Sequence, residues 1–150
     1  MTRKNAPALR IRRARAGDAS GIAVLCGQLG YPVSAAQMTA RLRQVLRQKN
    51  GACFVAEGRG RDVIGWVHVS FRPLLEVDQR AEIDGIIVAE NARSTGVGAR
   101  LLAEAEKWAR HMHCKGVSLR SNVIREKAHE FYLHQGYEHY KTQKAFRKAL

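Results

Sequence analysis

The sequence has 150 residues, of which 45% are hydrophobic and 26% charged, a balance that fits one soluble globular domain spanning residues 1–150. Its formal net charge of +13 attracts anions, but the basic residues are spread along the chain and only 7% of residues are aromatic, which argues against a nucleic-acid partner. No apolar run approaches the roughly 20 residues of a membrane span, and we read residues 1–8 as a flexible start without a signal peptide.

The first third of the chain predicts one strand followed by two helices. Residues 9–13 alternate apolar and charged side chains, as a half-buried strand does, and Gly17-Asp18 supplies a turn and a helix N-cap. A helix over about 18–29 follows. Ser34-Ala-Ala-Gln37 has the form of a capping box and starts a second helix that runs to about Lys49.

The middle of the chain predicts extended structure. Branched and aromatic residues dominate 53–57 and 63–71, and the glycine-containing segment 58–62 between them indicates a hairpin. A third strand over about 79–88 follows a loop at Arg72-Pro73.

The last third alternates helices and strands. We expect a helix over about 96–111, a strand over 116–121, a helix over 125–135, and a last pair of short strands from Gly136-Tyr137 toward Phe146. Helical spacing predicts the buried stripe of the first of these helices to be Val97, Leu101, Leu102, Ala105, Trp108, Ala109 and Met112. The order of elements predicts a mixed α/β sheet with helices on both faces.

The cysteines argue against both disulfides and a metal. Cys26, Cys53 and Cys114 form no Cys-x-x-Cys pair, which favours the reduced cytoplasm as the location. His111, His113 and Cys114 lie close in sequence but lack a second cluster, so we expect no bound metal.

A glycine-containing loop joins the strand ending at Val88 to the helix beginning near Gly96. The first amides of a helix have no internal partner and the helix dipole is positive there, so this loop is a candidate phosphate site. Gly96 and Gly98 would let the backbone approach a phosphate, and Arg93 and Arg100 add positive charge. The loop alone is equally compatible with a simple turn of the chain.

Two nucleotide motifs fit this loop poorly. It lacks the Gly-x-x-x-x-Gly-Lys-Ser/Thr pattern of a mononucleotide P-loop. The dinucleotide fingerprint requires a third glycine, but Leu101 stands at that position. An NADP-type oxidoreductase is therefore kept only as an alternative function.

Two motifs resemble one known family. Arg93-x-x-Gly96-x-Gly98, after the strand Ile86-Ile-Val88, is similar to the acyl-CoA signature Arg/Gln-x-x-Gly-x-Gly/Ala of the GNAT superfamily of acetyl-CoA-dependent N-acetyltransferases. Asn122, followed by Ala128-His-Glu-Phe-Tyr-x-x-x-Gly-Tyr137, resembles the second motif of that family. The likeness is to bacterial, aminoglycoside 6'-acetyltransferase-like members and covers nearly the whole chain. It implies about six to seven strands with a splayed central parallel pair, four helices on both faces, and acetyl-CoA as co-substrate.

The resemblance also implies which residues bind that co-substrate. Backbone groups of the strand before the loop would bond pantetheine, and residues 93–99 would wrap the pyrophosphate. The predicted binding residues are Ile86, Ile87, Val88, Arg93, Ser94, Thr95, Gly96, Val97, Gly98, Ala99 and Asn122.

Three residues are candidates for proton transfer. By resemblance Tyr132 is the general acid for the departing thiolate, with aromatic packing as the alternative reading. Glu82 and Asp84 stand two apart and share one face of a regular strand, together with Ile86 and Val88. That placement suits the two carboxylates to accept a proton through water, although a solvent-exposed strand end, or a water chain in place of either carboxylate, fits as well.

Acidic residues near the third predicted strand indicate the acceptor. Glu76, Asp78, Glu82 and Asp84 are four acids within nine residues of a basic chain, as a cationic acceptor would need. We therefore expect a primary amine of a small cationic acceptor to attack acetyl-CoA directly in a ternary complex, with a protein amine as the alternative acceptor. A basic nucleic-acid-binding module is a further alternative function, and the resemblance allows a homodimer.

Overall fold

The computed structural model describes residues 9–150, so the segment expected to be flexible, residues 1–8, lies outside the described residues. Contacts between residues divide the chain into two compact units, one that ends at Arg120 and one formed by Ser121–Leu150.

A five-stranded sheet forms the centre of the first unit, in the spatial order β1-β2-β3-β4-β5. The first four strands pair antiparallel, and the fifth is parallel to the fourth. The strands are β1 (Arg10–Arg13), β2 (Gly51–Glu57), β3 (Val63–Phe71), β4 (Ala81–Val88) and β5 (Val117–Leu119). The helices of this unit are α1 (Ala19–Gln28), α2 (Ala35–Arg47) and α3 (Val97–His111), with 3-10 turns at Ala16–Asp18 and Glu90–Ala92.

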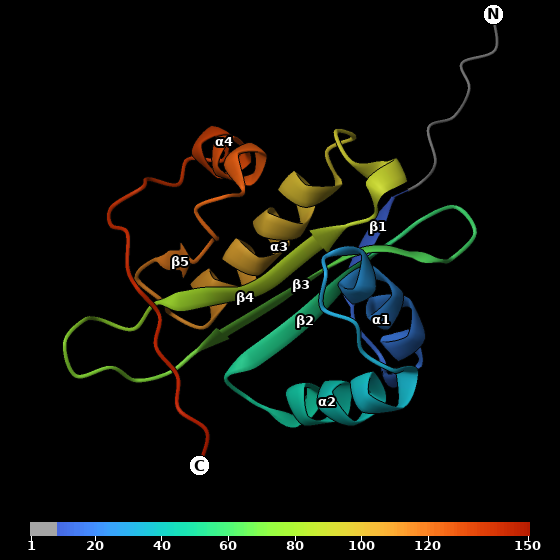
Figure 1. Ribbon diagram of the computed structural model, residues 1–150, viewed down its shortest axis with the longest axis horizontal. Coiled ribbons are helices and arrows are strands. Elements are labelled where there is room, and N and C mark those ends of the chain that lie inside the picture. Colours follow the sequence, from blue (N-terminus) through green and yellow to red (C-terminus); the bar gives the residue numbers. More distant parts are fainter. Residues whose placement is uncertain (1–8) are drawn as a thin grey trace, which may run out of the picture. The chain divides into compact units, whose positions relative to one another are not determined.

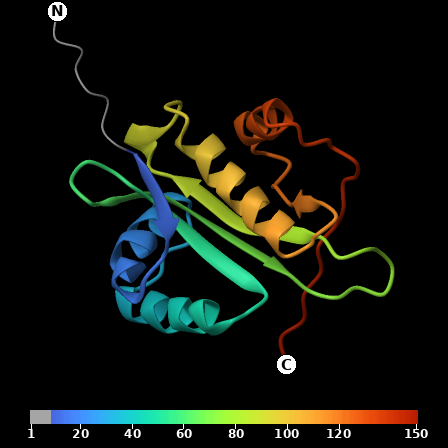
Figure 2. The ribbon, with the colours of Figure 1, turned by 180° about the vertical axis from the view of Figure 1, so that it is seen from behind.

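Helices α1 and α2 cover one face of the sheet, and α3 covers the other, as the two opposite views show (Figures 1 and 2). Side-chain alternation on the strands explains this arrangement, since successive residues point to opposite faces. Cys53 and Val55 of β2 pack with Ile22 of α1 and Leu42 of α2. The predicted arrangement of helices on both faces is confirmed.

Strand β4 has β5 as a neighbour along only part of its length. Ala81 pairs with Val117, and the pairing ends where Ile83 meets Leu119. Beyond that point β4 continues to Val88, and no further strand of the described chain pairs with it on this side. The predicted splayed parallel pair is therefore present.

A β-bulge interrupts β4. Val69 of β3 pairs with Ile83, but the preceding residue His68 pairs with Gly85. Asp84 is therefore an extra residue whose backbone has no pairing partner on β3. An extra residue reverses the two-residue alternation of side chains beyond it.

The bulge overturns one prediction about β4. Ile87, instead of Ile86, turns its side chain into the core next to α1. The expectation that Glu82 and Asp84 share a strand face with Ile86 and Val88 is wrong, because it assumed an uninterrupted strand.

The starts of α1 and α2 differ in how well the sequence predicts them. The capping box of α2 is confirmed, since Ser34 Oγ accepts from the Gln37 amide and Gln37 Oε1 accepts from the Ser34 amide, both at 3.1 Å. Asp18 occupies the N-cap position of α1, but its side chain makes no capping bond. Its carboxylate instead accepts two bonds from Arg12 at 2.8 Å and one from the Arg15 amide at 2.7 Å.

The second unit contains one helix, α4 (Glu126–His134). Residues 137–150 hold neither helix nor strand, so the predicted last pair of strands toward Phe146 is absent. The described chain consequently has five strands where six to seven were expected. A β-prone segment becomes a strand only where a neighbouring backbone pairs with it. None of the described helices is long and apolar enough to span a bilayer.

Candidate functional site

Helix α3 begins in the glycine loop that follows β4. Gly96 is its N-cap and has a φ of 86°, in the left-handed region that glycine adopts without strain. The first helical bond runs from the Arg100 amide to the Gly96 carbonyl, so the amides of residues 97–99 have no partner within the helix. This helix start therefore offers the unpaired amides and positive dipole end that an anion needs.

Three polar side chains hold the ends of this loop. Arg93 Nε donates to the Val88 carbonyl at 3.2 Å, and the Thr95 hydroxyl donates to the carbonyl of Ala92. Arg100 Nη1 donates to the carbonyl of Leu9 at 3.0 Å. Both arginines remain exposed, so they add positive charge near the helix start while fixing the loop.

The unpaired part of β4 presents backbone groups on its open side. Backbone groups on a strand alternate between its two neighbours. The Ala89 amide donates to the Ile64 carbonyl of β3 at 2.8 Å, so Ile87 also directs its backbone toward β3. Of the three predicted residues, Ile86 and Val88 direct theirs to the open side, where the Val88 carbonyl accepts from Arg93 and no strand of the described chain pairs with the remaining groups.

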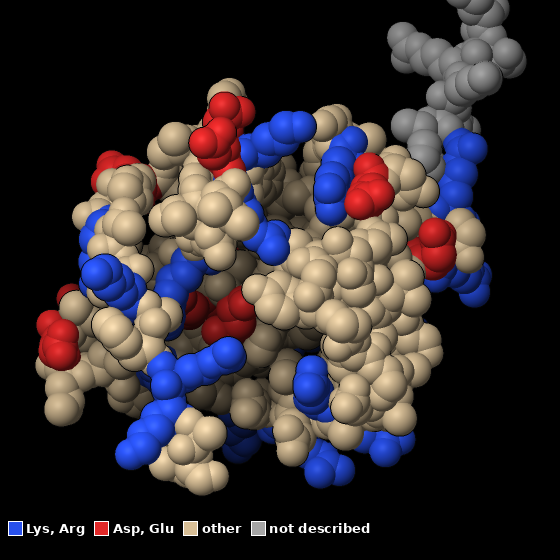
Figure 3. All heavy atoms as spheres, viewed as in Figure 1, with Lys and Arg blue, Asp and Glu red and all other residues tan. Residues whose placement is uncertain are grey.

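Asp84 lies with two polar residues of β3. Ser70 Oγ donates to Asp84 Oδ2 at 2.6 Å, and His68 Nε2 lies 3.7 Å from the same oxygen. The Asp84 side chain is 33% exposed. In the space-filling view, acidic side chains lie recessed over the sheet, where β4 runs in Figure 1 (Figure 3).

Glu82 is tied to β5. Its carboxylate accepts from Ser118 Oγ at 2.6 Å and from Arg120 Nε at 3.2 Å. The two predicted carboxylates thus differ, because Glu82 forms an ion pair with an arginine, whereas Asp84 contacts a serine and a histidine.

Sequence reasoning missed His68. Trp66, His68 and Ser70 follow each other at the two-residue period of one strand face, and that spacing was the available signal. The Trp66 Nε1 and His68 Nε2 atoms are buried and have no hydrogen-bond partner among the described residues. Burial lowers the pKa of His68, and the nearby Asp84 opposes that shift.

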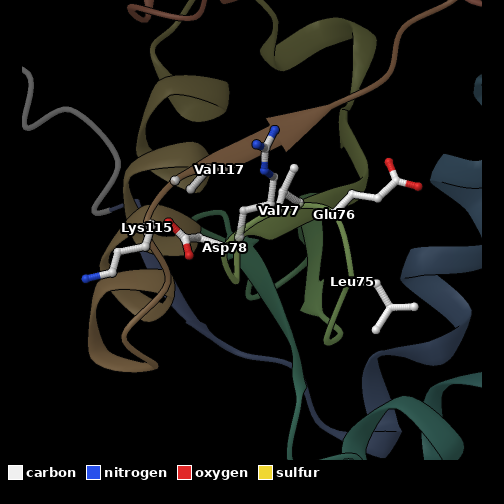
Figure 4. A pocket seen from close by; sticks show the side chains of 8 residues that line it. Leu75, Glu76, Val77, Asp78, Lys115 and Val117 are labelled. Carbon is white, nitrogen blue, oxygen red and sulfur yellow. The ribbon is translucent and has the colours of Figure 1, made fainter.

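The other two acids of the predicted acidic cluster lie elsewhere. Glu76 and Asp78 belong to the loop between β3 and β4 and line a cavity of about 800 Å³ (Figure 4). Arg80 and Lys115 line the same cavity (Figure 4). The four acids therefore do not form one patch, and none of the residues of the glycine loop lines this cavity.

Asn122, predicted to bind the co-substrate, caps a turn in the second unit. Its Oδ1 accepts from the Ile124 amide at 3.1 Å. Its carbonyl accepts from the Arg125 amide at 3.0 Å and from His129 Nε2 at 2.9 Å. These bonds shape the entry into α4.

Tyr132, the predicted acid, lies on α4 among aromatic rings. Its ring centroid is 5.4 Å from that of Phe131 and 6.2 Å from that of Tyr137. Burial raises the pKa of its hydroxyl, with Arg125 acting in the opposite direction. The hydroxyl therefore stays protonated at neutral pH, as a general acid must.

Residues 9–150 contain no group of three or more His, Cys, Asp or Glu side chains arranged to hold a metal ion. The three cysteines are free thiols, and burial raises the pKa of Cys53 to about 12.

Residues 22–137 match the family model described as "Acetyltransferase (GNAT) family". An aminoalkylphosphonate N-acetyltransferase of Salmonella typhimurium is 34% identical over 91 residues, and the match covers 58% of each chain. An aminoglycoside N(6')-acetyltransferase type 1 of Stenotrophomonas maltophilia is 29% identical over 144 residues, 93% of each chain. The chain thus spans little more than half of the Salmonella relative and nearly all of the Stenotrophomonas relative.

Solved structures show the same fold. The aminoglycoside N-acetyltransferase AAC(6')-Iy in complex with CoA superposes with a TM-score of 0.87 at 19% identity, covering 99% of both chains. The aminoglycoside 6'-N-acetyltransferase AAC(6')-Ih from Acinetobacter baumannii superposes with a TM-score of 0.82 at 19% identity, covering 95% of this chain and 99% of that one.

Proposed function

The chain belongs to the GNAT family of acetyltransferases, and on this premise we propose that it acetylates a primary amine of a small cationic acceptor. It is an acetyl-CoA-dependent N-acetyltransferase. The family match runs from residue 22 to residue 137 and so includes parts of both compact units, which supports a single acetyltransferase domain.

The observation that carries the acceptor proposal is the environment of Asp84. Its partners are Ser70 and His68, and no lysine or arginine of the described chain forms an ion pair with it. In a chain of net charge +13, a partly exposed carboxylate without a cationic partner is a favourable site for an ammonium group. The aminoglycoside name of the Stenotrophomonas relative agrees with a cationic acceptor.

The co-substrate fits the glycine loop and the open side of β4. We assign the pyrophosphate to the amides of residues 97–99, with Gly96 and Gly98 leaving room for it and Arg93 adding charge. Ile86 and Val88 would bond the extended arm as an added strand would. When bound, acetyl-CoA supplies an acetyl group activated as a thioester.

Two proton transfers remain for side chains of the protein. The acceptor ammonium must lose a proton to become a nucleophile, and we assign that contact to Asp84. Glu82, whose carboxylate accepts from Ser118 of β5, serves to join β4 to β5. The departing sulfur must gain a proton, and we assign this donation to Tyr132. The Val88 amide would polarise the acetyl carbonyl during direct attack by the amine.

Calorimetry with CoA and with NADP tests the binding site. We expect CoA to bind in the micromolar range and NADP not to bind. Gly98→Asp should abolish CoA binding, because it adds a negative charge at the helix start, whereas Gly116→Asp adds the same charge at an open position outside the loop and should not. Equal CoA affinity of Gly98→Asp and the unaltered protein would overturn the assignment of the loop.

A thiol-release assay with three acceptors tests the acceptor class. Neamine represents cationic amines, 2-aminoethylphosphonate represents the class named for the Salmonella relative, and a short peptide with a free N-terminus represents protein amines. We expect the highest kcat/KM for neamine. A preference for the phosphonate or for the peptide would contradict a cationic small-molecule acceptor.

A further inference from the structure

His68 on β3 is a half-buried titratable residue to which the proposed reaction assigns no part. Its side chain is 28% exposed, yet its Nε2 atom is buried and forms no hydrogen bond within the described chain. A buried polar nitrogen without a partner is costly, which calls for an explanation in a native site. The atom lies 3.7 Å from Asp84 Oδ2, the carboxylate assigned to the acceptor ammonium.

Among the groups that the neighbouring elements place around His68, Asp84 is the charged one. On β2 its cross-strand partner is Cys53, whose thiol stays neutral because burial raises its pKa to about 12. Burial likewise raises the pKa of Cys26 of α1, which packs in the same core cluster as Cys53. On β4, Asp84 carries the charge, and the residue opposite His68 is Gly85, which has no side chain.

We propose that Asp84 and His68 form one proton-accepting pair, in which Asp84 contacts the acceptor ammonium and His68 Nε2 holds the proton that the ammonium loses. This inference rests on the proposed function, since it gives Asp84 the same contact with the acceptor. His68 acts through Asp84 and does not itself touch the acceptor.

The proton balance of the reaction is complete with this pair. One N–H bond of the ammonium breaks, its electron pair stays on nitrogen, and the proton passes by way of Asp84 to His68, which becomes an imidazolium next to the carboxylate. Nitrogen then bonds to the acetyl carbon and the carbon–sulfur bond breaks. Tyr132 donates its proton to the departing sulfur, and the second proton that nitrogen loses as the amide forms passes through solvent to restore the Tyr132 hydroxyl. His68 finally releases its proton to water.

An imidazole suits this task better than a lone carboxylate. Carboxyl groups ordinarily titrate near pH 4, whereas imidazole titrates nearer neutrality and so retains a proton for longer at the working pH. Burial lowers the pKa of His68, which leaves the ring neutral and ready to accept at neutral pH. A hydrogen bond requires the 3.7 Å separation to shorten, as happens in many sites when substrate binds.

His68→Gln separates proton acceptance from polar contact. The glutamine amide reaches about as far as Nε2 and can still bond Asp84, but it cannot hold a proton. His111→Gln at the exposed end of α3 is the matched control. We expect His68→Gln to keep the CoA dissociation constant within about twofold and to lower kcat with neamine by about 10- to 100-fold, while His111→Gln changes neither.

The pH profile distinguishes proton acceptance from a structural role. In the unaltered enzyme, kcat/KM should fall as pH drops through the pKa of His68, because an imidazolium cannot accept a proton. His68→Gln should lack that acidic limb, whereas a merely destabilised protein would keep it. An unchanged acidic limb, or turnover within twofold of the unaltered enzyme, would overturn the proposal.

A measurement on the folded protein without acceptor tests the pair independently of activity. The His68 ring, followed by NMR, should titrate at a lower pH in Asp84→Asn than in the unaltered protein, because the carboxylate that favours the imidazolium is gone. An unmoved titration would overturn the pairing. If this shift appears but none of the three acceptors is acetylated, the acceptor assignment fails while the pair stands.

Discussion

The indole ring of Trp66 occupies the space where a side chain on Gly85 would stand. A Cβ atom on Gly85 would lie 2.8 Å from Trp66 Cη2 and 3.0 Å from Cζ3. Gly85 directly follows the bulge residue Asp84, and Trp66 packs against the core cluster that contains Leu25 of α1. The contact therefore holds the bulge, and with it Asp84, in register against the core.

We expect Gly85→Ala to destabilise the protein by about 1–3 kcal/mol in urea unfolding, because aromatic ring atoms next to the core cannot yield cheaply. The cost should shrink in a Trp66→Phe background, where the outer ring is absent. Gly27→Ala, within α1 and with no atom near the added Cβ, should instead stabilise by about 0.5–1 kcal/mol. Equal changes in the free energy of unfolding for Gly85→Ala and Gly27→Ala would contradict the close contact at Gly85.

Gly96 and Gly30 form a matched pair of left-handed glycines. Their φ angles are 86° and 89°, and a Cβ on either would meet no atom within 4 Å. Each alanine substitution should therefore cost about 1–2 kcal/mol of stability through backbone strain alone. Only Gly96→Ala should also raise the CoA dissociation constant, by about tenfold, because the amides of the loop lose their alignment. Calorimetry would refute this if both variants bound CoA alike.

Tyr132→Phe should spare CoA binding and lower kcat by roughly 10- to 1000-fold, since it removes the proposed proton donor. Tyr140→Phe, at an exposed tyrosine of the same unit, serves as the control and should leave kcat unchanged. Because burial raises the pKa of Tyr132, its hydroxyl keeps the proton on the alkaline side, and kcat should not decline through this group below about pH 10. Full turnover of Tyr132→Phe would show that the ring only packs.

The Arg12 guanidinium holds the pKa of Asp18 below its ordinary value of 3.8. A carboxylate with a lowered pKa stabilises the fold above its unfolded pKa, and this stabilisation disappears as pH falls through the folded pKa. Chemical denaturation should therefore show stability falling below about pH 4. Asp18→Asn should weaken that dependence and cost about 2 kcal/mol at neutral pH, whereas Asp78→Asn, at an exposed loop position, should do neither. If Asp18→Asn lost stability in acid as much as the unaltered protein does, the acid sensitivity would have to come from another group.

Local signals predicted much of the fold. The capping box at Ser34 is present, and six of the seven residues in the predicted stripe of α3 are buried: Val97, Leu101, Leu102, Ala105, Trp108 and Ala109. Helix starts and amphipathic faces depend on residues a few positions apart, so the sequence contains the information directly. The glycine loop is another local feature, and together with the second motif, at 122–137, it led to the family that the comparisons confirm.

The sequence by itself determined the family, the helices and the position of the anion-binding helix start, because each depends on neighbouring residues. Only the tertiary structure decided how β4 presents Asp84, since the bulge arises from its pairing with β3. It also brought His68 within 3.7 Å of that carboxylate and left residues 137–150 without a strand partner. Strand register and pairing depend on backbone segments distant in sequence, and no local pattern of residues specifies which segments meet.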